Sequence, residues 1–210
     1  WSSDVCSSDL YGSAMFETLD AVLADAKSHL TRAARDRRSP MHVPVVGTAD
    51  GDLRMMVLRD CTAEIGLLRF HTDARSAKVE RVAELGRASV LAFDPEAKVQ
   101  LRITGSARVE AAGPVADAAW AAASEYARRC YLAVGAPGSQ IDGPGSGLPA
   151  EVEGIRPSAE QLLPARENFA VLLIEPLSLD WLYLAHDGHR RAQFTRPEPG
   201  QDWQGTWVIP

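Results

Sequence analysis

Three short segments of the chain carry cations, hydroxyl groups and one amide in an order that could hold a phosphorylated, planar ligand. They are residues 54–59, residues 70–78 and residues 100–105. Cations and hydroxyls that converge on a phosphate offset most of its charge, because charge-assisted hydrogen bonds are the strong ones in proteins. The side chains with this chemistry are Arg54, Ser76 and Lys78. We therefore predict an anion site built from segments that lie apart in the sequence.

The second segment is predicted to begin a helix, and a helix N-terminus favours a bound anion. Apolar residues recur at helical spacing over residues 75–85, and Gly86 is well placed to end the helix. Ser76 and Lys78 then lie in the first turn, where free backbone N–H groups and the helix dipole attract negative charge. An ordinary solvated first turn is the alternative interpretation of these two residues.

Two residues just before this helix bear on the same site. Thr72 or Asp73 is expected to cap the helix, because hydroxyl and carboxylate side chains accept hydrogen bonds from the first free N–H groups. Asp73 should point away from a bound phosphate, since two negative charges in close contact repel each other.

The other two segments suit a flat ring whose edge carries both hydrogen-bond donors and acceptors. Residues 54–59 are apolar between Arg54 and Arg59, so the backbone of a strand could lie under such a ring. Gln100 offers both a donor and an acceptor from the polar face of its strand. The alternative for residues 54–59 is a buried central strand with an arginine at each mouth of a barrel.

The order and spacing of these segments resemble the pyridoxamine 5'-phosphate oxidase family, the flavin mononucleotide (FMN) binding split barrels. An arginine, an apolar run and a basic residue occupy residues 54–59. An aromatic-x-Thr strand end followed by Ser-x-Lys occupies residues 70–78, and Gln-x-Arg-x-x-Gly occupies residues 100–105. The resemblance is specific over about residues 42–109 and weaker toward the C-terminus.

The resemblance implies a cofactor, a site and an assembly. The cofactor is FMN, and the family places each FMN between two subunits, so a homodimer is expected. The cofactor-binding residues implied are Arg54, Met55, Met56, Val57, Leu58, Arg59, His71, Thr72, Ser76, Lys78 and Gln100. Arg59 and Arg191 are the expected contacts for a small-molecule substrate, which can carry a phosphate group. No catalytic side chain is identified, and no metal site is expected.

The activity implied is FMN-dependent oxidation or reduction of a small molecule, with pyridoxine or pyridoxamine 5'-phosphate as the nominal substrate. The family holds that substrate with an Arg-x-His pair near the C-terminus, and here residues 189–193 read His-Arg-Arg-Ala-Gln, out of register. These basic residues could contact the cofactor or an anionic substrate, or form a solvated turn. The alternatives are a flavin-binding or haem-handling split-barrel protein without oxidase activity, or a pocket that prefers a deazaflavin, because one fold hosts several functions.

Hydrophobic periodicity predicts a mainly β, α+β protein: a split β-barrel of antiparallel strands with peripheral helices. Helices are predicted at residues 16–37, 75–85 and 114–129. Strands are predicted at residues 41–48, 53–60, 64–72, 88–93, 99–110, 168–175, 178–184, 189–195 and 204–209. The Gly- and Pro-rich residues 135–164 are expected to form a substrate-side loop or flap.

Composition narrows the partners and the location. With 22 basic against 28 acidic residues, the net charge of −6 disfavours nucleic acid or an anionic membrane as the main partner. No apolar run is long enough to span a bilayer and no secretory signal is evident, so a cytoplasmic protein is expected. Residues 1–10 look like a non-native leader, and residues 11–210 are expected to form one domain. The three cysteines lack CxxC spacing.

Overall fold

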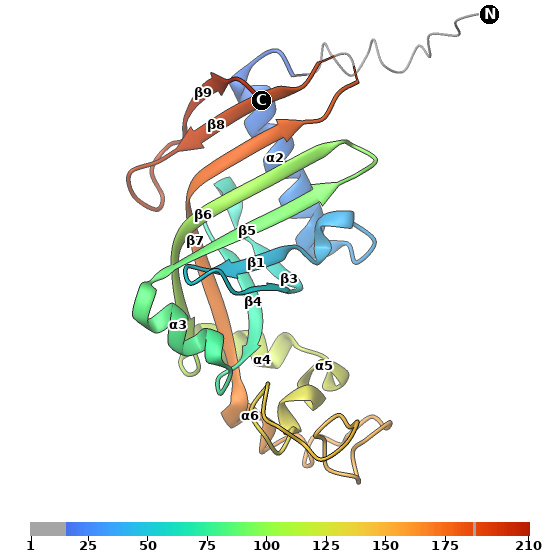
Figure 1. The fold of residues 1–210 in the computed structure, drawn as a ribbon. Coiled ribbons are helices and arrows are strands. Elements are labelled where there is room, and N and C mark those ends of the chain that lie inside the picture. Colours follow the sequence, from blue (N-terminus) through green and yellow to red (C-terminus); the bar gives the residue numbers. More distant parts are fainter. Residues whose placement is uncertain (1–15, 187) are drawn as a thin grey trace, which may run out of the picture.

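The computed structural model describes residues 16–186 and 188–210, and its strands form one curled antiparallel sheet (Figure 1). The proposed leader, residues 1–10, lies outside the described residues. Within the described part of the chain the strand order is β2-β1-β5-β6-β7-β4-β3, and β8 and β9 extend the sheet from β7. The strands are β1 (Val45–Thr48), β2 (Leu53–Met55), β3 (Leu58–Cys61), β4 (Leu68–Asp73), β5 (Arg87–Asp94), β6 (Val99–Glu110), β7 (Phe169–Tyr183), β8 (Arg190–Thr195) and β9 (Gln204–Val208).

Helices lie around this sheet, and several of them gather at one end of it. The α-helices are α2 (Leu19–Arg35), α3 (Ala77–Leu85), α4 (Pro114–Ala122), α5 (Glu125–Arg129) and α6 (Ala165–Asn168). Short 3₁₀ turns are η1 (Pro40–His42), η2 (Ala63–Ile65) and η3 (Cys130–Leu132). We call α4, α5, η3, α6 and residues 133–164 the lower lobe, which lies at the bottom of Figure 1.

The sheet closes on itself because two strands that are consecutive in the chain lie at its opposite edges. β2 pairs only with β1 and β3 pairs only with β4 within the described residues, yet just Met56 and Val57 separate them. The chain therefore crosses from one edge of the sheet to the other within two residues. A curled antiparallel sheet with peripheral helices confirms the predicted split-barrel fold class.

Residues 53–60 were predicted as one strand, and this prediction was wrong because the strand breaks at the crossing. The alternative of a buried central strand also fails for the first half, since Leu53 and Met55 are 67% and 68% exposed. The second half is different: Leu58 is 1% exposed and belongs to the barrel core. The two halves differ in burial because β2 and β3 lie at opposite edges of the sheet.

Prolines and a 3₁₀ turn shorten two other predicted strands. Residues 41–48 begin as η1, and β1 starts only at Val45, after Pro44, because proline has no N–H to offer a strand ladder. Residues 64–72 likewise begin in η2, where Glu64 and Ile65 have positive φ angles of 59° and 52°. Such a backbone is incompatible with an extended strand, so β4 starts at Leu68.

One long strand replaces the two strands predicted at residues 168–175 and 178–184. β7 runs unbroken past Pro176, and its pairing with β6 shifts register between Thr104 and Gly105. A side chain at Gly105 would place its Cβ 2.0 Å from the carbonyl oxygen of Glu175. Glycine at this position therefore lets the two backbones approach where the bulge bends the sheet.

The helix predicted at residues 114–129 is divided into α4 and α5. The break falls at Ser124, whose Oγ accepts a hydrogen bond from the backbone N–H of Ala127 and so caps α5. In contrast, the helix at residues 16–37 is confirmed as α2, and the helix at residues 75–85 is confirmed as α3. Gly86 ends α3 with φ of 61°, in the left-handed region.

Two apolar clusters stabilise the molecule. The larger one fills the barrel and joins it to α2, through buried side chains such as Val22, Leu30 and Trp181. The smaller one lies under the lower lobe, where Phe169 and Tyr131 pack against α4. Among the described residues, no helix is both long and apolar enough to cross a membrane.

Candidate functional site

A pocket of about 420 Å³ lies where β2, β3 and the end of β4 meet α3 and the lower lobe. We call it the main pocket. Its lining residues are Arg54, Met55, Met56, Val57, Arg59, His71, Thr72, Asp73, Lys78, Ala127, Cys130, Tyr131 and Pro137. Its volume is within the range typical of small-molecule sites. Most of the cofactor-binding residues expected from the sequence therefore line one pocket.

At one end of the main pocket, an ammonium and two hydroxyls converge at the start of α3. Lys78 Nζ donates hydrogen bonds to Ser76 Oγ at 3.0 Å and to Thr72 Oγ1 at 3.2 Å. The two hydroxyl oxygens are 3.4 Å apart, and both residues are buried. β4 ends beside the first turn of α3, so residues from two elements meet at a helix N-terminus, where anions are favoured.

Arg54 reaches the same end of the pocket from β2. Its guanidinium donates to the carbonyl oxygen of Val46 and to Thr48 Oγ1, each at 3.3 Å, and it pairs with Asp52. Only 18% of the side chain is exposed. The β1–β2 hairpin, which places Val46 opposite Arg54, thus orients this cation.

The electrostatics of this end favour a bound anion. Burial lowers the pKa of Lys78, and the positive charge of Arg54 lowers it further. Two cations that repel each other in a partly buried pocket are stabilised by a ligand with opposite charge. A phosphate dianion would supply that charge, and the two hydroxyls and two cations have the donors to bind it. The residues present therefore fit the phosphate end of FMN.

Asp73, the one acidic side chain in the lining, is paired with Arg75. The Asp73 carboxylate accepts hydrogen bonds from Arg75 Nε at 3.0 Å and from an Arg75 terminal nitrogen at 2.7 Å. The predicted cap was wrong, because the N-cap of α3 is Ser76 and neither Thr72 nor Asp73. The Ser76 side chain makes no cap hydrogen bond and instead donates to the Asp73 carbonyl oxygen at 2.8 Å.

Arg59 and His71 also line the main pocket. Burial lowers the pKa of His71 to about 4, with further lowering by the charges of Arg59 and Arg69. The imidazole is therefore neutral at physiological pH. Its Nε2 and the Nε of Arg59 are buried and have no hydrogen-bond partner in the described part of the chain. Buried polar atoms without partners are rare and indicate a place for a ligand or solvent.

The lower lobe supplies a wall that the sequence did not reveal. Cys130, Tyr131 and Pro137 line the main pocket opposite the strands. Arg75 donates to the carbonyl oxygen of Ala133 at 2.9 Å, which ties this wall to the end of β4. No motif marks these residues; only the position of the lobe brings them to the pocket.

Gln100 and Arg191 are not brought to the main pocket of their own chain. Gln100 alternates with buried Val99 and Leu101 on β6 and so belongs to the outer face of the sheet, like Arg102 two residues later. Arg191 on β8 donates to Asp180 on the neighbouring strand, with the shorter contact at 2.7 Å. Both predicted contacts thus lie on a different surface from Arg54 and Lys78.

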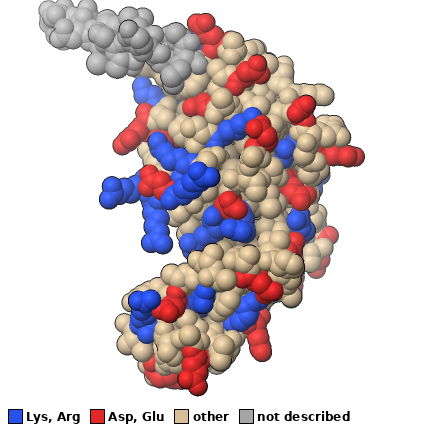
Figure 2. Space-filling view, turned by 180° about the vertical axis from the view of Figure 1, so that it is seen from behind, with Lys and Arg blue, Asp and Glu red and all other residues tan. Residues whose placement is uncertain are grey.

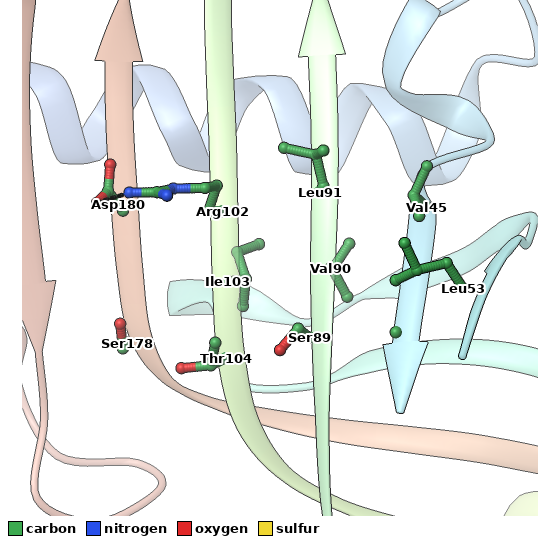
Figure 3. A pocket seen from close by; sticks show the side chains of 11 residues that line it. Val45, Leu53, Ser89, Val90, Leu91, Arg102, Ile103, Thr104, Ser178 and Asp180 are labelled. Carbon is green, nitrogen blue, oxygen red and sulfur yellow. Dashed lines mark hydrogen bonds and ion pairs between the residues drawn. The ribbon is translucent and has the colours of Figure 1, made fainter. Parts of the chain in front are cut away.

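That surface, the outer face, combines apolar side chains with a charged network (Figure 3). Asp180 accepts hydrogen bonds from Arg102 at 2.7 Å and from Gln193 at 2.9 Å, in addition to Arg191. Burial raises the pKa of Asp180, but the bonds from Arg191, Gln193 and Arg102 outweigh this effect and hold the pKa below its usual value. Beside the network, Leu53, Met55, Leu91 and Phe93 are all more than 40% exposed.

The curled antiparallel sheet, with a cationic pocket at the N-terminus of a flanking helix, defines a split-barrel protein with a candidate site for an anion. Residues 25–111 match the family model described as "Pyridoxamine 5'-phosphate oxidase, FMN-binding domain". This stretch includes all three motif segments found in the sequence. The resemblance to the pyridoxamine 5'-phosphate oxidase family is therefore confirmed.

Solved structures show the same fold. A pyridoxamine 5'-phosphate oxidase-related, FMN-binding protein from Nostoc punctiforme PCC 73102 is 23% identical, covers 89% of this chain and 96% of its own, and has a TM-score of 0.68. PhzG from Burkholderia lata 383, solved with tetrahydrophenazine-1-carboxylic acid, is 21% identical, covers 91% and 90%, and has a TM-score of 0.59. No curated protein matches the chain. At these identities the likeness establishes the fold.

Proposed function

We propose that the main pocket binds FMN and that the protein uses it to oxidise or reduce a small molecule. The observation that supports this most is the convergence of Arg54, Thr72, Ser76 and Lys78 at the N-terminus of α3. These groups would hold the phosphate. The ring would lie along residues 55–57, between the strands and the wall formed by the lower lobe.

FMN, when bound, supplies the redox chemistry, and the protein supplies orientation and exclusion of water. Tyr131 and Pro137 would cover the ring on the side away from the barrel. Arg59 and His71, which also line a second, adjoining pocket, would meet the substrate, and the neutral imidazole can donate or accept a hydrogen bond. Pyridoxine or pyridoxamine 5'-phosphate is the nominal substrate from the family resemblance.

The working unit we propose is a homodimer that pairs through the outer face. Gln100 lies on this face, away from the main pocket of its own chain, so a second copy is needed to bring a Gln100 to the ring. Such a pairing would bury the exposed apolar side chains Leu53, Met55, Leu91 and Phe93. Burial of a large apolar patch would favour association of the two subunits.

Purification and turnover test this proposal in two stages. The protein should be yellow, or turn yellow on addition of FMN, and should release FMN on denaturation. A colourless protein that ignores added FMN contradicts the cofactor assignment. The second stage measures steady-state oxidation of pyridoxamine 5'-phosphate by dioxygen. Turnover would indicate an oxidase of this nominal substrate, and no turnover would indicate a flavoprotein that has another substrate or no oxidase activity.

A further inference from the structure

A second pocket, of about 280 Å³, lies next to the main pocket and is lined by four arginines. We call it the arginine pocket. Its lining residues are Ala34, Arg35, Arg37, His42, Leu58, Arg59, Arg69, His71, Ala119, Ala122, Ala123, Ser124 and Ala127. Three of them, Arg59, His71 and Ala127, also line the main pocket, so the two spaces adjoin.

The charge of the arginine pocket is of one sign. No acidic residue is among its lining residues. Arg69 contacts Asp60 at 3.5 Å from outside the lining, and within residues 16–186 and 188–210 no carboxylate pairs with Arg35, Arg37 or Arg59. Figure 2 shows Lys and Arg side chains gathered above the waist between the barrel and the lower lobe, with fewer Asp and Glu side chains among them. Among the described residues, three of the four guanidinium groups therefore have no paired carboxylate, and such a cluster favours a bound anion.

Buried polar atoms without a hydrogen-bond partner support a ligand more strongly than charge alone. Arg59 Nε, Arg69 Nε and His71 Nε2 are all buried without a hydrogen-bond partner among the described residues. All three residues line the arginine pocket. The two arginine N–H groups are donors, and the imidazole nitrogen donates or accepts according to its tautomer. Unsatisfied buried polar atoms are costly, and three at one pocket are unusual for a site with no ligand.

The elements around the pocket hold it in shape. α2 ends at Arg35, and the turn that follows places Arg37 in the pocket lining. His42 is fixed because its Nδ1 lies 2.6 Å from the carbonyl oxygen of Ala33, and Arg69 extends from β4. The pocket is therefore made from four separate parts of the chain: α2 with its turn, η1, the β3–β4 hairpin and the start of the lower lobe.

We propose that the arginine pocket is a subsite for an oxyanion, a carboxylate or a phosphate, carried by the substrate at the end remote from the reacting atoms. The proposal rests on the proposed function, because the main pocket is then filled by FMN and the substrate enters through the shared residues Arg59 and His71. Planar guanidinium groups bind either oxyanion in a bidentate manner. The substrate is thereby a small acidic molecule rather than a neutral one.

Calorimetric titration of FMN-loaded protein with inorganic phosphate and, separately, with malonate tests the subsite. At least one of the two anions should bind, and the one that binds more tightly indicates which oxyanion the substrate carries. Arg37→Ala should weaken that binding at least fivefold, and Arg35→Ala combined with Arg37→Ala should abolish it. Arg38→Ala is the matched control, because Arg38 is exposed in the same turn and does not line the pocket.

Two outcomes would overturn the subsite: neither anion binds at millimolar concentration, or the Arg37 and Arg38 variants bind equally. Failure of the FMN assignment gives a different result. If no FMN binds, the same titration of the Lys78→Met variant, in which the phosphate-binding end of the main pocket is disabled, still reports on the arginine pocket. If Arg37→Ala weakens anion binding in this variant, the proposed subsite is supported. If Arg37→Ala leaves the binding unchanged, the proposed subsite is contradicted.

Discussion

Lys78 donates a hydrogen bond of 3.0 Å to Ser76, so a cation in the first turn of α3 contacts the residue at the N-cap position of that helix. This contact directs the ammonium into the main pocket, toward Arg54, whose charge contributes to lowering the Lys78 pKa. The repulsion between these two cations therefore destabilises the ligand-free protein and is relieved when an anion binds. Sites of this kind lose function on substitution without losing stability.

The Lys78→Met substitution tests this trade-off. It removes a partly buried charge next to another cation but leaves the Thr72 and Ser76 hydroxyls to contact each other. We expect the free energy of unfolding of the FMN-free protein, measured in urea, to stay the same or to rise. FMN binding should weaken by about 1.5–3 kcal/mol, the usual worth of a hydrogen bond to a charged group. Arg81→Ala, farther along α3 and outside the pocket, is the control. A clear loss of stability in Lys78→Met would show that the ammonium is structural.

The close approach of β6 and β7 at the bulge gives a prediction about stability. Gly105→Ala forces a Cβ to within 2.0 Å of the Glu175 carbonyl oxygen, so the two strands must separate. We expect the free energy of unfolding to fall by about 2 kcal/mol or more, as for other overpacking substitutions. Gly143→Ala is the control, since a Cβ there meets nothing within 4 Å and the backbone is not left-handed. Equal stability of the two variants would contradict the role given to Gly105.

His71 should make the protein sensitive to acid. Its pKa is lowered from 6.5 to about 4 by burial and by Arg59 and Arg69, so between these pH values the unfolded chain binds a proton that the folded chain does not. Stability then falls as pH falls through this window, and it is unaffected by His71 above it. At pH 5 we expect a loss of about 1–2 kcal/mol relative to pH 7.5, allowing for partial exposure. Urea unfolding of the wild type and of His71→Gln at both pH values measures the difference. If both proteins lose the same stability, His71 is not the group responsible.

The outer face gives a prediction about assembly. Leu91→Asp places a charge in the proposed subunit contact, next to the Asp180 network. We expect sedimentation to show a dimer for the wild type and a monomer for this variant. The monomer should also bind FMN more weakly, because it lacks Gln100 of the partner subunit. Val134→Asp is the control: Val134 is 80% exposed but lies on the lower lobe. A monomeric wild type with full FMN affinity would contradict the proposed assembly.

Sequence patterns predicted those parts of the fold that depend on local periodicity. The alternation along residues 99–110 and the apolar stripes of α2 and α3 identify these elements with nearly correct bounds. The errors arose where tertiary structure overrides a local signal. Pro176 reads as a strand break, yet β7 passes through it because Gly105 opposite allows a bulge. Residues 53–60 read as one strand, yet the barrel closes at their centre.

In the candidate site, as in the fold, the sequence predicted the residues that belong to local motifs but not those brought in by tertiary packing. Arg54, Thr72, Ser76 and Lys78 belong to short motifs, and the structure brings them together. The lower-lobe wall at Cys130, Tyr131 and Pro137 has no motif, because its position depends on how the lobe packs under Phe169. Arg35 and Arg37 are visible in the sequence, but their proximity to Arg59 and Arg69 emerges only from the packing of α2 against β3.

Flavin fluorescence titration with FMN and with riboflavin is the most direct measurement, because these ligands differ only in the phosphate. If Arg54, Thr72, Ser76 and Lys78 bind that phosphate, the wild type should bind FMN about 10- to 100-fold more tightly than riboflavin, as expected for loss of a charge-assisted contact. The preference should largely disappear in Lys78→Met. Equal affinity of the wild type for the two flavins, or an undiminished preference in the variant, would contradict the account.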